Sequence, residues 1–337
     1  MAVVSIGSLV LESNKILHGA TLAYEQCGKR DAPAILVCHA LTGDQYSVGT
    51  EEKPGWWAGL IGPGKALDTR VFQVITFNVL GGCNGSTGPQ SLNPETGKPY
   101  RASFPLLTIR DMVRAEHAAL KKIGINHLAA VIGGSLGGMK TLEWGHLFPE
   151  FVDVIFPLAV TPAYSDYGIA FNHIGIQAIE RDADFNSGNY KDSAKLQGFH
   201  IARMAGMVTY RSPDMFNGRF TRVHSGKQFD VESYLTYQGE KLAKRFDANS
   251  YLTLLKAMNT HDVEKVKVET EIFSLSFAHD LLYPQELMVP WLKRMPNASW
   301  ELVETQFGHD GFLVEFEKWG RQIQQKLNSL LVSQPIR

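Results

Sequence analysis

The sequence has little cysteine, almost no net charge and no clustered metal ligands. Its three cysteines, Cys27, Cys38 and Cys83, are scattered without a C-x-x-C pair, so neither a disulfide framework nor a zinc knuckle is expected. No H-E-x-x-H pattern or group of Cys and His residues occurs either, and no metal is predicted. The formal net charge is −1, which gives no reason to expect nucleic acid or an anionic membrane as a partner.

Long apolar runs and targeting signals are also missing. No run approaches the roughly 20 apolar residues that a membrane-spanning helix needs. The first residues, MAVVSIGSLVLESNK, lack both the basic start and the sustained apolar stretch of a signal peptide. We therefore expect a soluble, cytoplasmic protein.

One glycine-rich loop could be mistaken for a nucleotide-binding motif. The segment Gly81-Gly82-Cys83-Asn84-Gly85 matches neither the P-loop pattern nor the dinucleotide fingerprint. No bound cofactor is predicted from it. We interpret its cysteine as a packing residue, because no histidine follows at a spacing that would suggest a nucleophile.

Short apolar runs alternate with helical patterns along most of the chain. Such alternation predicts an α/β fold with a mostly parallel sheet covered by helices on both faces. Thr108 and Asp111 resemble a capping box at the start of one helix. Strands are expected at 20–26, 34–38, 71–79, 128–132, 152–160, 270–277 and 299–303, and helices at 108–123, 285–295 and 315–331.

The middle third of the chain follows a different pattern. Between residues 161 and 263 strand-like runs become rare, and segments such as Gly198–Met207 look helical. We predict a helical lid at 161–263, inserted into a sheet domain formed by 1–160 and 264–337. The last expected helix is amphipathic, with its apolar side formed by Phe316, Trp319, Ile323, Leu327 and Leu330.

A candidate nucleophile lies between an expected strand and an expected helix. Gly133-Gly134-Ser135-Leu136-Gly137 fits G-x-S-x-G, the strained turn that lifts a serine hydroxyl above a sheet edge. The flanking positions must be small, because side chains there would clash. The same pattern also occurs in phosphate-binding turns, so the rest of a catalytic site must support this interpretation.

A serine nucleophile needs a base and an orienting acid, which in this architecture follow it in the order acid, then histidine. Asp280 comes directly after the expected strand 270–277, and His309 lies between glycines after the strand 299–303. His279 is the main rival for the base. We favour His309 because it follows the acid in the chain.

Acyl chemistry also requires donors for an oxyanion. The backbone N–H of Leu136, directly after the serine, is one candidate. The other should come from the loop after an early strand. That loop is His39-Ala40-Leu41-Thr42-Gly43, and we select the N–H of Leu41.

Several longer segments resemble one known family. They are HALTGD (39–44), GWW (55–57), IGPGKALDT (61–69), NVLGGCNGSTGPQSLNPETGKPY (78–100), FPLLTIRDMV (104–113), AAVIGGSLGGMKTLEW (129–144), AFNHIGIQAI (170–179), ARMAGMVTYRS (202–212) and GHDGFL (308–313). Together they look like the homoserine O-acetyltransferases, and the likeness covers nearly the whole chain.

The resemblance implies an α/β-hydrolase fold and a triad of Ser135, Asp280 and His309. It also implies acyl transfer from acyl-CoA, with acetyl-CoA expected, to the hydroxyl of L-homoserine in methionine biosynthesis. The family further suggests a ping-pong reaction, no bound cofactor and a homodimer formed through the lid helices.

The resemblance assigns the amino-acid substrate to Arg203 and Asp310. An arginine can hold an α-carboxylate with two hydrogen bonds, and a carboxylate can hold the ammonium group. Arg211 and Arg222 remain competitors for the role of Arg203.

Two departures from the family pattern bear on the substrate. Leu136 replaces a common methionine at nearly the same volume. Gln45-Tyr46-Ser47 stands where an Ala-His pair is frequent, beside the expected oxyanion loop, and puts the donor and acceptor in question.

Three alternatives stay open at this stage. The first is an esterase with the same triad, the second a transferase with succinyl-CoA or L-serine, and the third a non-catalytic binding protein. To exclude water, we expect lid residues to form a tunnel wall: Tyr164, Phe171, Met204, Met207, Tyr210, Met215 and Phe216.

Overall fold

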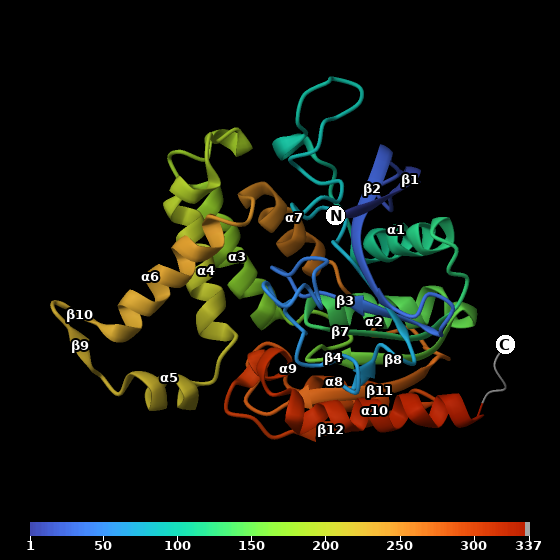
Figure 1. Ribbon diagram of the computed structural model, residues 1–337. Coiled ribbons are helices and arrows are strands. Elements are labelled where there is room, and N and C mark those ends of the chain that lie inside the picture. Colours follow the sequence, from blue (N-terminus) through green and yellow to red (C-terminus); the bar gives the residue numbers. More distant parts are fainter. Residues whose placement is uncertain (334–337) are drawn as a thin grey trace.

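A computed structural model describes residues 1–333 and contains an eight-stranded sheet with helices on both faces and a group of helices to one side (Figure 1). Neighbours from β6 to β12 are parallel, and β1 and β2 join antiparallel at one edge. The predicted mostly parallel sheet is therefore confirmed. In spatial order the strands are β1 (Ala2–Val10), β2 (Ile16–Gly28), β6 (Gln73–Phe77), β3 (Ala34–Cys38), β7 (Leu128–Gly134), β8 (Val152–Leu158), β11 (Glu271–Phe277) and β12 (Ala298–Val303).

Both faces of the central strands are buried, which explains their continuous apolar sequences. On β3, Ile35 and Val37 face one apolar cluster while Leu36 and Cys38 face the other, as the period of two requires. The first cluster is completed from α10 (Phe316–Ser333), and the second from helices on the opposite side. Those helices are α1 (Ile109–Lys122), α2 (Leu136–Leu147) and α8 (Gln285–Leu292).

Two sequence predictions about helices are confirmed in detail. The Thr108 side chain accepts a hydrogen bond from the Asp111 N–H at 3.2 Å, and the Asp111 carboxylate accepts one from the Thr108 N–H at 3.1 Å. On α10, Trp319, Ile323 and Leu327 are fully buried against the sheet. The apolar stripe in the sequence therefore identified the buried face of that helix.

The lid lies between β8 and β11 and is almost entirely helical. Its helix α3 packs on α4, and α4 packs on α6, while α5 and a small hairpin project to one side (Figure 1). Buried lid side chains such as Leu255 belong to the same apolar cluster as the α1 face of the sheet. The lid elements are α3 (Asp166–Glu180), α4 (Gln197–Thr209), α5 (Pro213–Phe220), β9 (His224–Ser225), β10 (Gln228–Phe229), α6 (Asp230–Ala243) and α7 (Ala248–Met258).

Short elements complete the chain. Within residues 1–333, no helix combines the length and apolar character needed to cross a membrane. The remaining elements are β4 (Ile61–Gly62), β5 (Leu67–Asp68), α9 (Gly311–Val314) and 3₁₀ turns at Arg101–Ser103, Pro149–Phe151, Asn186–Gly188, Ser193–Lys195 and Gly308–Asp310.

Candidate active site

Ser135 lies on the sharp turn between β7 and α2. Its backbone has φ of 60°, a region that residues other than glycine rarely adopt and that is often found at functional sites. The turn admits no side chain at the first and last glycines of the motif. A Cβ on Gly137 would lie 2.1 Å from the Cys38 carbonyl oxygen, and one on Gly133 would lie 2.6 Å from the same atom. The G-x-S-x-G spacing is thus a steric requirement of this strand-to-helix turn.

A buried ion pair lies beneath the turn, and the sequence analysis missed it. Lys140 on α2 pairs with Glu116 on α1, and both side chains are fully buried. The Trp144 Nε1–H also donates to Glu116 at 3.1 Å. The pattern of apolar residues in the sequence does not reveal such a pair, because lysine and glutamate usually occupy the exposed face of a helix.

His309 and Asp280 form a buried hydrogen-bonded pair. The His309 Nδ1 lies 2.7 Å from the Asp280 Oδ2, and Oδ1 of the same carboxylate accepts the N–H groups of Leu282 and Tyr283 at 2.9 and 3.0 Å. These hydrogen bonds fix the orientation of the carboxylate beside the imidazole. We assign the Nδ1 proton to the hydrogen bond with Asp280, which leaves Nε2 as an acceptor.

Ser135 and His309 line the same cavity beneath the lid, whose empty space, open solvent included, is about 740 Å³, whereas the rival His279 does not line it. The Tyr283 ring stacks on the His309 imidazole with 4.9 Å between ring centroids. The catalytic roles of the serine and the histidine stay predictions.

Part of the expected tunnel wall is present. Tyr164, Phe171 and Tyr210 line the cavity. The other four expected wall residues do not line it, because their helix positions direct them elsewhere. These are Met204, Met207, Met215 and Phe216.

The two candidate oxyanion donors flank the serine. Leu41 lines the cavity, and Leu136 is the first residue of α2. Among residues 1–333, no group accepts a hydrogen bond from either backbone N–H. The role of both N–H groups as oxyanion donors stays a prediction.

A buried histidine holds the loop that carries Leu41. The Val79 N–H donates to the His39 Nε2 at 2.9 Å, so that the His39 Nδ1–H donates to the Ala40 carbonyl at 2.7 Å. Burial lowers the pKa of His39 to about 3, and the ring is neutral at neutral pH. Sequence reasoning had treated this residue only as part of a motif.

Arg203 and Asp310 both line the cavity. The Arg203 Nε is buried without a hydrogen-bond partner in the described chain, and its guanidinium carbon lies 5.5 Å from the centre of the Tyr210 ring. Arg203 is partly exposed, and no carboxylate among the described residues forms an ion pair with it, so its guanidinium is available to an anionic substrate group. Its assignment to the substrate carboxylate stays a prediction.

The two competing arginines have other contacts. The Arg211 Nε donates to the Asp310 Oδ2 at 3.0 Å, so this arginine holds the carboxylate rather than facing the cavity. Burial raises the pKa of Asp310, and the charge of Arg211 opposes that rise. Arg222 lies near the lid hairpin with its guanidinium over the Phe229 ring, and it does not line the cavity.

The segment that departs from the family pattern lies behind the oxyanion loop. Gln45 and Ser47 are buried, and the Ser47 hydroxyl lies 2.7 Å from the Thr76 hydroxyl. None of the residues 45–47 lines the cavity.

Among the described residues, no three His, Cys, Asp or Glu side chains are grouped to hold a metal ion.

Known proteins resemble this chain over nearly its full length. A family model described as "alpha/beta hydrolase fold" matches residues 33–316. A homoserine O-acetyltransferase of Moorella thermoacetica is 44% identical, and the alignment covers 96% of this chain and 94% of the relative.

Two solved structures bear on the activity. A homoserine O-acetyltransferase from Bacillus anthracis matches with a TM-score of 0.90 and 25% identity, covering 97% of both chains. The esterase E22 matches with a TM-score of 0.89 and 26% identity, covering 97% of this chain and 99% of its own. The fold therefore accommodates both transfer and hydrolysis, and the site must distinguish them.

Proposed function

The chain belongs to the homoserine O-acetyltransferase family of the α/β-hydrolase fold, and on that premise we propose that it moves an acetyl group from acetyl-CoA to the hydroxyl of L-homoserine. The cavity shared by Ser135, His309 and Arg203 carries the proposal. It combines a nucleophile, a base and a cation suited to an amino-acid carboxylate. We expect the product, O-acetylhomoserine, to serve methionine biosynthesis.

In the first half-reaction the Ser135 oxygen attacks the thioester carbonyl carbon. The His309 Nε2 takes the serine proton, and Asp280 stabilises the resulting imidazolium through the 2.7 Å hydrogen bond. The N–H groups of Leu41 and Leu136 stabilise the tetrahedral oxyanion. The carbon–sulfur bond then breaks, the coenzyme A thiolate leaves with the proton from His309, and acetyl-Ser135 remains.

In the second half-reaction homoserine replaces coenzyme A. His309 removes the proton of the homoserine hydroxyl, whose oxygen attacks the acetyl carbonyl. Collapse of the tetrahedral intermediate breaks the bond to the Ser135 oxygen, which recovers its proton from His309. Donor and acceptor react in separate steps, so we expect ping-pong kinetics.

Transfer requires that homoserine compete with water for the acyl group. A held acceptor gains a large effective concentration. In this proposal Arg203 binds the carboxylate of homoserine with its forked N–H groups, and Asp310 shares its charge between Arg211 and the ammonium group. Tyr164 and Tyr210 reduce the space open to water.

Mass spectrometry of the acylated protein tests this proposal. After incubation with acetyl-CoA alone, we expect the added mass of one acetyl group on the peptide that contains Ser135, and none with succinyl-CoA. Addition of homoserine should remove that mass and yield O-acetylhomoserine. Succinylation in place of acetylation, or an unmodified serine with both donors, contradicts the proposal.

A hydrolase is the second candidate, because esterase E22 shares the fold at 26% identity over nearly the whole chain. The same acyl-serine would then react with water. The ratio of free acetate to O-acetylhomoserine, measured at increasing homoserine, separates the two candidates. Acetate that stays the main product at saturating homoserine favours the hydrolase.

We also propose a homodimer through the lid helices. Apolar side chains remain about half exposed on α3, α4 and α6, and a partner would cover them. These residues are Tyr167, Ile174, Ile201, Val208 and Tyr237. Sedimentation should give a dimer that Ile201→Glu converts to monomers, and a monomeric parent protein contradicts the proposal.

A further inference from the structure

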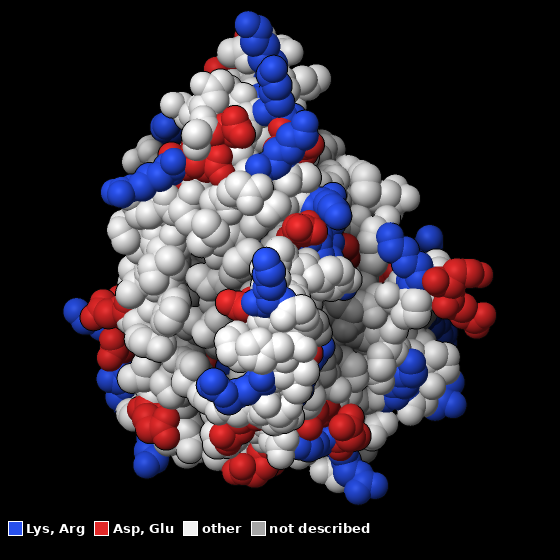
Figure 2. Space-filling view, turned by 90° about the vertical axis from the view of Figure 1, so that its left-hand side faces the viewer, with Lys and Arg blue, Asp and Glu red and all other residues white. Residues whose placement is uncertain are grey.

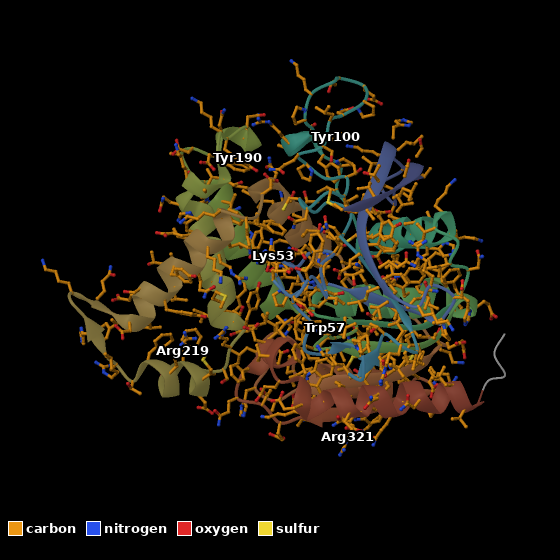
Figure 3. The ribbon with its side chains drawn as sticks, viewed as in Figure 1. Lys53, Trp57, Tyr100, Tyr190, Arg219 and Arg321 are labelled. Atoms are coloured by element: carbon orange, nitrogen blue, oxygen red, sulfur yellow. The ribbon has the colours of Figure 1, made fainter. Side chains whose placement is uncertain are left out.

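A second cavity lies between the lid and a long loop that contains the 3₁₀ turn Arg101–Ser103. Its empty space is about 1050 Å³ and is open to solvent. Tyr190, labelled near the upper end of the lid in Figure 3, is part of its wall. The lining comes from three chain segments, at residues 83–101, 190–194 and 243–249.

Four cationic side chains line this second cavity, namely Arg101, Lys191, Lys244 and Arg245. Among residues 1–333, no carboxylate lies within 4.0 Å of any of the four cationic groups. The upper part of Figure 2 shows lysine and arginine side chains with acidic side chains among them. An excess of unpaired positive charge around a concave surface favours an anionic ligand.

The two acidic residues of this cavity offset only half of its positive charge and form no ion pair with the cations. Both carboxylate oxygens of Asp247 accept hydrogen bonds from neighbouring residues. Oδ1 accepts from Gln90 at 3.1 Å and from the Tyr190 hydroxyl, while Oδ2 accepts from the Ser250 N–H at 2.8 Å. Asp192 accepts the N–H of Ala194 at 2.9 Å. Both carboxylates accept hydrogen bonds from nearby backbone N–H groups. With four cations and two acids in its lining, the cavity has a formal charge of +2.

Arg245 connects the second cavity with the catalytic one. Its Nη1 donates to the Thr42 carbonyl oxygen at 2.9 Å, and Thr42 lines the catalytic cavity beside Leu41. Burial and the nearby charge of Arg203 lower the pKa of Arg245. A cation in this position is stabilised by an anion that approaches from the second cavity.

We propose that this second cavity binds the phosphate groups of the nucleotide end of the acyl-CoA donor, an inference that rests on the proposed function. The pantetheine arm separates those phosphates from the thioester. A donor whose carbonyl lies at Ser135 must therefore place its nucleotide outside the catalytic cavity. The second cavity, related to the catalytic one by the Arg245–Thr42 hydrogen bond, supplies two arginines and two lysines for phosphate oxygens.

The test compares two donors that differ only in the nucleotide. Acetyl-CoA carries it and S-acetylpantetheine lacks it. In the double variant Lys191→Gln/Lys244→Gln, we expect the preference in kcat/KM for acetyl-CoA over S-acetylpantetheine to fall roughly tenfold or more, from lost charge-assisted contacts. Lys241→Gln is the matched control, because it removes a charge from the last turn of α6, which ends next to Lys244, and Lys241 does not line the cavity. An unchanged preference in the double variant overturns the inference.

Calorimetry with adenosine 3′,5′-bisphosphate tests the site without catalysis. We expect binding to the parent protein and to Lys241→Gln, and weaker binding to the double variant. Inorganic phosphate that binds as tightly as the nucleotide would indicate a general anion site and would contradict the inference. If neither acetyl-CoA nor succinyl-CoA acylates Ser135 while the parent protein still hydrolyses p-nitrophenyl acetate, the proposed function fails. If acetyl-CoA acylates the serine and the double variant keeps its preference, only this inference fails.

Discussion

The sheet core and the lid contribute to the site in different ways. The core holds Ser135 on a strained turn and locks Asp280 with two backbone N–H groups and His309. The lid contributes Arg203 and Arg211, whose positions depend on helices packed over the cavity. In the proposed function the core performs the acyl chemistry, while the contacts to the amino acid come from Arg203 of the lid together with Asp310, which the core holds beside the lid residue Arg211.

This difference explains why fold comparison leaves the acceptor open. Esterase E22 and a homoserine O-acetyltransferase match the chain with nearly equal TM-scores, 0.89 and 0.90. Two or three side chains in a lid change such a score little, yet each charged hydrogen bond is worth about 1.5–3 kcal/mol. If core and lid divide the work in this way, mutations in the two regions should affect different measurements.

The largest effect is expected for Ser135→Ala in the core. Loss of the nucleophile prevents formation of the acyl-enzyme, and we expect kcat to fall on the order of 10⁴-fold or more. The unfolding transition should stay close to that of the parent protein, because the hydroxyl is replaced by a smaller group. Steady-state rates and intact-protein mass spectra check this prediction, and a variant that keeps most of its activity contradicts it.

Lys140→Met tests how much the buried ion pair of Lys140 and Glu116 stabilises the protein. Removal of the ammonium group leaves Glu116 buried without its cation, and we expect a loss of about 3–5 kcal/mol in the free energy of unfolding. Denaturant titration measures that loss. The double variant Glu116→Leu/Lys140→Met should recover much of it, since no charge then remains buried. Equal destabilisation in both variants would show that shape, not charge, determines the effect.

Acid should destabilise the core through His39. The folded protein holds the ring neutral with a pKa of about 3, against an ordinary value of 6.5, so the unfolded chain binds one more proton between those values. Stability is therefore present above pH 6.5 and falls with decreasing pH, by about 1.4 kcal/mol per pH unit from this group.

Denaturant titration at several pH values between 4 and 6.5 measures that slope. In the His39→Gln variant the slope of the unfolding free energy against pH should lose the contribution of one proton, whatever effect the substitution has on stability at neutral pH. His261, whose pKa burial lowers to about 4, lies at the end of the lid, and His261→Gln should act similarly. An unchanged slope in both variants would exclude buried neutral histidines as the cause.

Much of the core was predictable because its signals are local. The continuous apolar run of Ala34–Cys38 predicts β3 with its observed bounds. Thr108 and Asp111 predict the start of α1. The Gly-Ser segment predicts the turn at Ser135, because only small residues fit there. The chain order of acid and histidine also predicted the Asp280–His309 contact.

The lid was less predictable because its important contacts connect distant residues. The pair of Arg211 and Asp310 joins positions 99 residues apart, and no local pattern indicates it. Four of the seven expected tunnel residues, such as Met204, do not line the cavity, since composition indicates apolar character but not which face of a helix is covered. Outside the lid, the edge strand β1 of the sheet was also not predicted, because much of it is exposed.

Arg203→Lys gives the smallest of these effects and addresses the lid alone. A lysine keeps the charge but loses the forked pair of donors, so we expect KM for homoserine to rise about tenfold, the equivalent of one charged hydrogen bond. The rate at which acetyl-CoA acylates Ser135 should not change, and the ratio of acetate to O-acetylhomoserine should increase. Arg222→Lys, near the lid hairpin and outside the cavity, is the matched control. If acylation slows as much as transfer, Arg203 supports the core chemistry itself, and the division between the two regions does not hold.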